Sequence, residues 1–223
     1  RDREQNFIIE GVKICDEVIE SHAERIQQIV CLNDYVHKIP KTLNPLILNC
    51  GPNELARIST LKTPNSILIV LKKEKELDFN PSKKTILLDD IQDPGNLGTL
   101  VRTADWFGIY QFVCSKKTAD LFNAKALQST MGSFLRVKIW YVDLEEFIEN
   151  HALNIGGALL DGGSIDLVDF NQMNALLLGN ESRGISQALK TSVNQPIRID
   201  GKGSAESLNV AIAGAIFMQH WSK

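Results

Sequence analysis

Short apolar runs and longer amphipathic stretches alternate regularly over the second part of the chain. The runs have the length of buried strands, and the stretches have the apolar spacing that is typical of helices. This pattern predicts strands at residues 85–88, 112–114, 137–142, 157–160, 175–178 and 196–199, and helices at residues 97–107, 124–130, 144–150, 186–192 and 208–221. Alternation of this kind indicates an α/β fold with a mainly parallel sheet covered on both faces. Ligands of such sheets bind at the carboxyl ends of the strands, so the loops that follow the strands are where a site is expected.

The first part of the chain has a different pattern. It predicts a helix at residues 11–19 and strands at 29–32 and 67–71, which together form a small α/β domain. The segment 74–84 is charged and contains Asn and Pro, which indicates a linker. The sequence therefore predicts a domain at residues 1–76, a linker at 77–83 and a second domain at 84–223.

Composition narrows the possible classes of protein. No apolar run approaches the roughly 18 residues of a membrane span, and the charged start does not resemble a secretory signal, so we expect a cytoplasmic protein without a membrane partner. The four cysteines lie far apart, which predicts reduced, buried thiols and no metal site. The net charge is −3, so a nucleic-acid site must be a local patch.

Three loops of the second domain contain residues suited to chemistry. In residues 93–108, one proline and two glycines (Pro94, Gly95 and Gly98) shape a turn, Asn96 offers an amide, and Arg102 projects about one turn into the helix that follows. A guanidinium at this place can hold a phosphate through paired hydrogen bonds. A helix-surface ion pair between Arg102 and Asp105 explains the same arginine equally well.

The second loop, residues 178–186, follows a buried strand. Gly179 lets a ligand approach the backbone, and Asn180 and Glu181 supply directional polar groups. An ordinary turn with a glutamate near a helix start is the alternative.

The third loop enters an apolar helix through Ser207, Leu208 and Asn209. Both Ser207 and Asn209 suit a helix N-cap, but capping explains only one of them. Small residues in the helix, among them Gly214, allow close packing either in the core or at a subunit interface.

Two common classes of nucleotide enzyme lack support. Neither the glycine fingerprint of dinucleotide-binding folds nor the P-loop lysine motif occurs in the chain. Gly95 and Gly98 also lie too far beyond Leu88 to form the glycine-rich turn of Rossmann-type methyltransferases.

In this order, the three loops resemble the three motifs of the SpoU (TrmH) family of RNA ribose methyltransferases in the SPOUT superfamily. The resemblance covers roughly residues 84–223 and rests on Asp93, Pro94, Asn96, Gly98, Arg102 and Ala104, on Gly179, Asn180, Glu181 and Gly184, and on Ser207, Leu208, Asn209, Val210 and Ala213. It implies a C-terminal trefoil knot, S-adenosylmethionine as cofactor, a homodimer, and methylation of a ribose 2′-hydroxyl in ribosomal RNA or, less favoured, transfer RNA.

The resemblance also implies roles for single residues. The cofactor would be bound near Gly179, Asn180, Ile199 and Leu208, and the catalytic residues would be Arg102, Asn96, Glu181, Ser207 and Asn209. Arg102 would meet the RNA phosphate and the 2′-hydroxyl, and the other four would orient the reacting groups. The third motif departs from the family pattern, because its usual Ile-Pro-Met corresponds to Ile199, Asp200 and Gly201 here.

Residues 1–76 are similar to the small ribosomal-protein-like domain that often precedes this catalytic domain. The similarity rests on Phe7, Glu10, Gly11, Ile58, Ser59, Thr63 and Pro64. It implies a substrate-binding role, with Arg1, Arg3, Arg57 and Lys62 as candidate RNA contacts. For each of them taken singly, a solvated surface charge is the favoured interpretation.

Two other functions remain open from the sequence. One is a non-catalytic RNA-binding or ribosome-assembly factor on the same fold, for which the loss of Pro and Met around Asp200 is the main support. The other is an α/β enzyme for a small acidic metabolite with Arg102 as a carboxylate clamp, which leaves the first domain unexplained.

Overall fold

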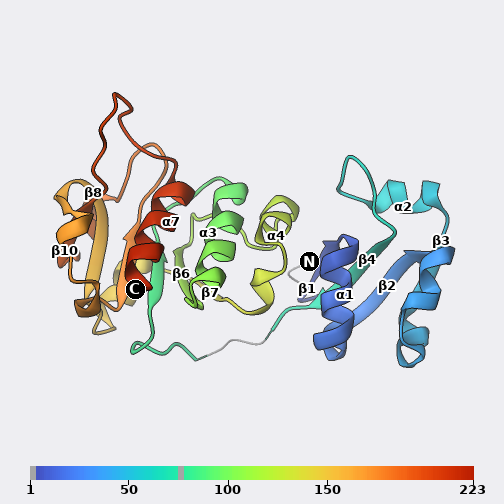
Figure 1. Cartoon of the computed structure of the whole chain (residues 1–223). Helices are drawn as coiled ribbons and strands as arrows, with labels where there is room; N and C mark the ends of the chain where they lie inside the picture. The colour runs from blue at the N-terminus through green and yellow to red at the C-terminus, as the bar shows by residue number, and fades with distance from the viewer. Residues whose placement is uncertain (1–3, 75–77) are drawn as a thin grey trace. The chain divides into compact units, whose positions relative to one another are not determined.

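The structure is a computed structural model that describes residues 4–74 and 78–223 (Figure 1). The chain divides between residues 77 and 78 into two compact units. Part of the predicted linker and the candidate RNA contacts Arg1 and Arg3 lie outside the described residues.

The N-terminal unit is built on a four-stranded sheet with the order β1-β4-β2-β3. Its strands are β1 (Asn6–Glu10), β2 (Ile26–Leu32), β3 (Ile47–Cys50) and β4 (Ile67–Lys72), and its α-helices are α1 (Val12–Ser21) and α2 (Pro52–Ile58). Strand β4 runs antiparallel to β1 and β2, whereas β2 and β3 are parallel. The predicted helix and both predicted strands are present, but β1, β3 and α2 were not predicted.

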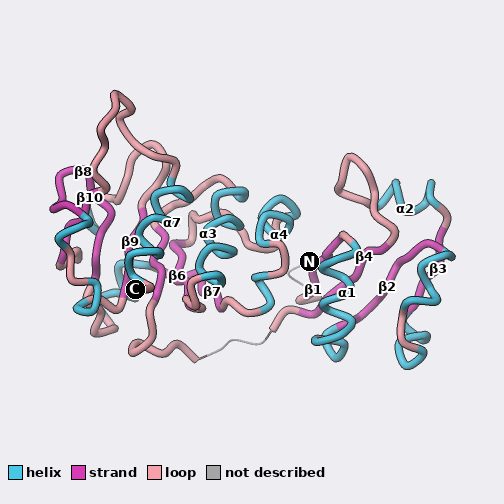
Figure 2. The backbone as a smooth tube through the Cα atoms, in the orientation of Figure 1, coloured by secondary structure: helices cyan, strands magenta, loops and turns pink. Residues whose placement is uncertain are grey.

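The C-terminal unit contains a six-stranded sheet with the order β10-β8-β9-β5-β6-β7 (Figure 2). Its strands are β5 (Thr85–Leu88), β6 (Gln111–Ser115), β7 (Lys138–Val142), β8 (Ile155–Ser164), β9 (Ala175–Leu178) and β10 (Gln195–Arg198). All five neighbouring pairs are parallel, which confirms the predicted α/β fold with a mainly parallel sheet.

Helices pack on the sheet of this unit and bury its apolar strands. They are α3 (Pro94–Trp106), α4 (Ala124–Thr130), α5 (Leu144–Glu149), α6 (Gln187–Lys190) and α7 (Val210–Trp221). Helix α3 contacts both α4 and α7, and the three lie side by side in Figure 1. Leu144 of α5 and Leu189 of α6 join a separate apolar cluster with Leu87 and Val113 from the sheet.

Glycines permit the closest approaches between these elements. A Cβ atom at Gly98 would lie 2.6 Å from the Cβ of Ser129, so α3 and α4 can pack together only with glycine there. A Cβ at Gly214 would collide with Leu100 of α3, so this small residue of α7 serves the core. Next to it, Ile212 is 54% exposed.

Two predicted boundaries were wrong for identifiable reasons. Strand β8 extends to Ser164 instead of ending at residue 160, because Gly162 lies against β10: a Cβ there would come 2.5 Å from the backbone nitrogen of Ile197. Helix α3 begins at Pro94 instead of residue 97, because Asp93 caps it. Asn96 therefore lies in the first helical turn, where it was expected in a loop.

Among the residues the structure describes, no helix is long and apolar enough to cross a membrane. The cysteines are unpaired, and Cys15, Cys31 and Cys114 are buried, as predicted, whereas Cys50 is only partly buried. No group of potential metal ligands occurs within residues 4–74 and 78–223.

Candidate functional site

The start of α3 is fixed by Asp93. Its Oδ1 accepts hydrogen bonds from the backbone nitrogens of Gly95 at 2.6 Å and Asn96 at 3.1 Å, and its Oδ2 pairs with Lys125 Nζ at 2.8 Å. The hydrogen bond from Lys125, supported by those from Asn96 and Gly95, holds the pKa of Asp93 below its usual value. The side chain of Asn96 thus projects from a well-anchored helical turn.

The loop after β9 is shaped by Asn180 and Gly179. Asn180 Nδ2 donates to the carbonyl of Asp90 at 2.7 Å, and its Oδ1 accepts from the backbone of Ser182 and Arg183. A Cβ at Gly179 would collide with the backbone of Gly184, so the loop itself requires this glycine. This geometry turns Glu181 toward α3.

Glu181, Asn96 and Asn209 form one hydrogen-bonded chain that joins the three loops. Asn96 Nδ2 donates to Glu181 Oε1 at 3.0 Å, and Asn209 Nδ2 donates to Asn96 Oδ1 at 3.1 Å. The Oδ1 of Asn209 caps α7 by accepting from the backbone nitrogens of Ala211 and Ile212. The structure therefore brings together three of the five predicted catalytic residues, from positions 85 and 113 residues apart in sequence.

The carboxylate of Glu181 is held in its ionised form. Burial favours the neutral form, but hydrogen bonds from the Asn96 side chain and from the backbone nitrogens of Gln92 and Asp93 outweigh it and lower the pKa. Glu181 is therefore an acceptor at neutral pH. Because the Glu181 carboxylate only accepts hydrogen bonds, the Asn96 amide must turn its Nδ2 toward it. The Asn96 Oδ1 then faces Asn209 and accepts from its Nδ2.

Arg102 is exposed on α3 and has no hydrogen-bond or ion-pair partner among the described residues. Asp105, its possible partner in sequence, forms a bidentate pair with Arg136 instead. The ion-pair alternative for Arg102 is therefore wrong. The guanidinium is left free for a ligand, although the structure does not place it in contact with the chain of Glu181, Asn96 and Asn209.

Residues 199–208 follow β10 as an irregular segment. No backbone hydrogen bond joins them to another described residue, so their N–H and C=O groups are available to a ligand. Leu208 is 48% exposed and Ile199 is partly buried, which adds apolar surface. Ser207 is exposed and, within the described part of the chain, its hydroxyl has no partner.

Asp200, which replaces the proline of the family pattern, is fixed by its neighbours. Its carboxylate accepts a hydrogen bond from Arg198 Nε at 2.9 Å. A hydrogen bond from Ser164, together with Arg198, keeps the pKa of Asp200 below its usual value. An ion pair thus restrains the start of this segment where a proline ring would otherwise do so.

A sulfonium cofactor with an adenine and an amino-acid end fits this segment. Free backbone N–H and C=O groups can form hydrogen bonds with the edge of the adenine and with the carboxylate of the cofactor. Exposed apolar side chains can pack against the adenine ring. Gly179 and Asn180, in contrast, are explained by the shape of their own loop.

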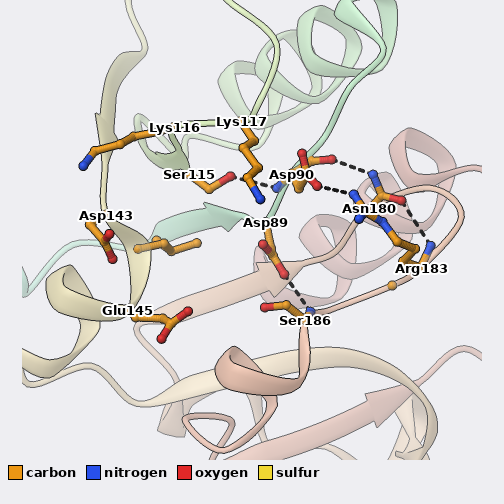
Figure 3. Close-up of a pocket in the computed structure, with 12 residues that line it drawn as sticks. Asp89, Asp90, Ser115, Lys116, Lys117, Asp143, Glu145, Asn180, Arg183 and Ser186 are labelled. Atoms are coloured by element: carbon orange, nitrogen blue, oxygen red, sulfur yellow. Dashed lines mark hydrogen bonds and ion pairs between the residues drawn. The ribbon is translucent and has the colours of Figure 1, made fainter.

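A polar pocket at the carboxyl ends of β5, β6 and β7 was not predicted (Figure 3). Among its lining residues are Asp89 and Asp90, directly after β5, and Lys116 and Lys117, directly after β6. Because ligands of parallel sheets bind at the carboxyl ends of the strands, a site could have been expected at these two loops as well. Asp90 has a φ of 61°, a left-handed conformation that is uncommon for a residue other than glycine.

Comparison with known proteins decides the family. Residues 83–219 match the model of the SpoU rRNA Methylase family. The chain belongs to this family. The α/β unit that carries the three loops is thus a SpoU methylase unit, and the resemblance seen in the sequence is confirmed.

Relatives in the SpoU family extend over the whole chain. A 23S rRNA (guanosine(2553)-2′-O)-methyltransferase of Bacillus subtilis is 31% identical over 99% of this chain and 90% of its own length. A 23S rRNA (uridine(2479)-2′-O)-methyltransferase of Streptomyces viridochromogenes is 25% identical over 98% of this chain and 83% of its own length.

Solved structures agree with the fold. A putative RNA methyltransferase of the TrmH family from Porphyromonas gingivalis is 33% identical, with a TM-score of 0.88 over 99% of this chain and 91% of that one. An AdoMet-bound rRNA methyltransferase from Sinorhizobium meliloti is 26% identical, with a TM-score of 0.88 over 99% of this chain and 88% of that one.

Proposed function

We propose that this chain transfers a methyl group from S-adenosylmethionine to a ribose 2′-hydroxyl of RNA. The observation that carries the proposal is the chain of hydrogen bonds from Glu181 through Asn96 to Asn209, because it assembles the polar residues of all three SpoU loops at one edge of the sheet. Relatives that cover nearly the whole chain are named as 2′-O-methyltransferases of 23S rRNA, which favours ribosomal over transfer RNA.

Arg102 binds the RNA phosphate and donates a hydrogen bond to the 2′-hydroxyl. A guanidinium stays protonated in proteins, so Arg102 polarises and positions the hydroxyl rather than removing its proton. Its exposure and its lack of a partner among the described residues support this role. The 2′-hydroxyl is oriented for in-line attack on the methyl group by Asn96, Glu181, Asn209 and Ser207. Such positioning lowers the barrier of a transfer reaction.

S-adenosylmethionine supplies an electrophilic methyl group on its sulfonium. Residues 199–208, with Ile199 and Leu208, bind it through free backbone groups, next to the loop of Gly179 and Asn180. We also propose that this segment takes part in a C-terminal trefoil knot. The segment leaves β10 at the edge of the sheet and leads to α7, which packs on α3, so it must cross the sheet between the two.

The remaining parts of the proposal concern partners. The N-terminal unit binds the RNA, and Arg57 and Lys62, which are exposed and make no ion pair with described residues, are its candidate contacts. The working form is a homodimer, supported by apolar side chains left exposed on α3 and α7: Trp106 at 84% and Ile212 at 54%.

The test combines cofactor binding with methyl transfer. Calorimetric titration with S-adenosylmethionine should show saturable binding, and transfer of a tritiated methyl group to a 23S rRNA transcript should require Arg102. The Arg102→Ala variant should lose at least about a hundredfold in turnover, equivalent to about 2.7 kcal/mol, while its affinity for the cofactor stays within a factor of two or so of the wild type.

Arg136→Ala is the matched control, because Arg136 is also an exposed arginine of this unit but is paired with Asp105. If Arg102→Ala kept near-normal turnover, the assignment of Arg102 would be refuted. If the folded wild-type protein bound no cofactor with or without RNA, the chain would instead be an RNA-binding factor on the same fold.

A further inference from the structure

The polar pocket described above has no part in the proposed transfer. It encloses about 410 Å³, within the range of roughly 300–1,000 Å³ that is usual for small-molecule sites. Its lining does not include Asn96, Arg102, Ser207 or Asn209, but it includes Asn180, Arg183 and Gly184 from the loop that carries Glu181. The pocket is therefore separate from the transfer site but shares a loop with it.

The floor of the pocket contains a carboxylate oxygen to which no described residue donates a hydrogen bond. Asp89 is only 7% exposed, and its Oδ2 accepts from the backbone nitrogen of Ser186 at 2.7 Å. Its Oδ1 has no partner among the described residues. The hydroxyl of Ser186 makes no capping bond at the start of α6. Because Asp89 lines the pocket, its free carboxylate oxygen can accept a hydrogen bond from an N–H group of a ligand.

The rim of the pocket carries cations without partners. Lys116 and Lys117 are exposed, and neither ammonium group pairs with a described residue. In Figure 3 they stand on one side of Asp89 and Asp90, with Ser186 and Arg183 on the other side. Asp90 is paired with Arg183, so its charge is already compensated. Two further acids line the pocket: Asp143 caps α5 by accepting from the backbone of Glu146, and Glu145 lies exposed in the first turn of α5.

We propose that this pocket receives a guanine nucleotide of the substrate RNA, next to the nucleotide that is methylated. Its phosphate binds Lys116 and Lys117, and the two neighbouring N–H groups on the guanine edge donate to Asp89 Oδ1 and Ser186 Oγ. Guanine fits better than uracil because uracil presents a single N–H donor on that edge. The inference rests on the proposed function, since it takes the RNA substrate from it.

The first test removes the cations. The double variant Lys116→Gln/Lys117→Gln is compared with Lys83→Gln/Lys138→Gln, a matched pair of exposed lysines at the amino ends of β5 and β7. The first variant should weaken binding of a 23S rRNA transcript about tenfold and reduce the slope of log affinity against log salt by about 0.7–0.9, the value for one phosphate. Turnover at saturating RNA and affinity for S-adenosylmethionine should not change. Equal RNA binding by the two double variants would overturn the proposal.

The second test addresses the base and needs no methyl transfer. Calorimetric titration of the whole protein with guanosine 5′-monophosphate and uridine 5′-monophosphate should give about tenfold tighter binding of the guanine nucleotide. Asp89→Asn keeps an acceptor for Ser186 but loses the charge, and it should abolish that preference. Thermal denaturation checks that Asp89→Asn folds. If it does not fold, the RNA binding of Lys116→Gln/Lys117→Gln decides the proposal.

The two proposals can fail separately. Equal affinity for both nucleotides, or no binding of either, would overturn the nucleotide pocket even if methyl transfer were normal. Guanine-selective binding that depends on Asp89, in a protein that transfers no methyl group, would overturn the proposed function and leave the pocket as a nucleotide site.

Discussion

Asn209 has two separable roles, and one substitution distinguishes them. Its Oδ1 caps α7, and its Nδ2 donates to Asn96 at 3.1 Å. Asn209→Asp keeps the capping oxygen but loses the donor, whereas Asn209→Ala loses both. The new carboxylate would face Asn96 Oδ1, and Asn96 could satisfy it only by turning its amide away from Glu181.

The expected free-energy changes follow from these contacts. Loss of an N-cap costs about 1 kcal/mol, and loss of an exposed neutral hydrogen bond costs about 0.5–1.5 kcal/mol. A negative charge at a helix start contributes about 0.3–1 kcal/mol, which offsets the lost bond in Asn209→Asp. The free energy of unfolding should therefore change by less than about 1 kcal/mol in Asn209→Asp and fall by about 1.5–2.5 kcal/mol in Asn209→Ala.

Turnover should not follow stability, because both variants break the connection to Asn96. We expect both to lose about 10- to 100-fold in methyl transfer at saturating substrates, equivalent to about 1.4–2.7 kcal/mol of transition-state stabilisation. Urea denaturation measures stability, and tritium transfer to a 23S rRNA transcript measures turnover. Wild-type turnover in Asn209→Asp would refute the reasoning, since Asn209 would then act only as a helix cap.

Three further predictions concern stability and pH. Gly98→Ala should lower the free energy of unfolding by about 1–3 kcal/mol, because its methyl group would overlap α4, whereas Gly203→Ala, with open space around it, should change it by less than about 0.5 kcal/mol in the same urea assay. The lowered pKa of Glu181 means that its stabilising contribution is present above the ordinary carboxyl pKa and is lost as pH falls through its lower native value; Glu181→Gln should remove that part of the pH dependence of unfolding. Lys84 donates to the carbonyl of Trp221 at the end of α7, so Lys84→Met should cost about 1 kcal/mol, and an unchanged melting curve would contradict this role.

The sequence predicted the sheet well where burial alone determines the strand. Residues 85–88 and 175–178 are short apolar runs, and both are fully buried strands with the predicted bounds. For β8 it found only the middle, residues 157–160, and missed the ends of the strand, because the glycines at 156–157 and 162–163 give no apolar pattern. These glycines are explained by contacts distant in sequence, which no local pattern reveals: Gly156 lies against Met173, Gly157 against Val193 and Gly162 against β10.

The site was predicted from residue types and the family resemblance, not from contacts. Asn96, Glu181 and Asn209 could be nominated, but their hydrogen bonds depend on how the strands are ordered in the sheet. The nucleotide pocket was missed for another reason. Lys116 and Lys117 look like ordinary surface charges in sequence, and Asp89 becomes notable only when its burial and its unpaired oxygen are known.

The order in which the ribosome makes this chain bears on when the enzyme can work. Asn96 and Asn209 are separated by 113 residues, and Glu181 is made between them. At a synthesis rate of about 5–20 residues per second, Asn209 is added about 6–23 s after Asn96. A nascent chain with most of its sheet already made therefore lacks the complete constellation. The hydrogen-bonded chain of Glu181, Asn96 and Asn209 can therefore form only after the start of α7 has been synthesised.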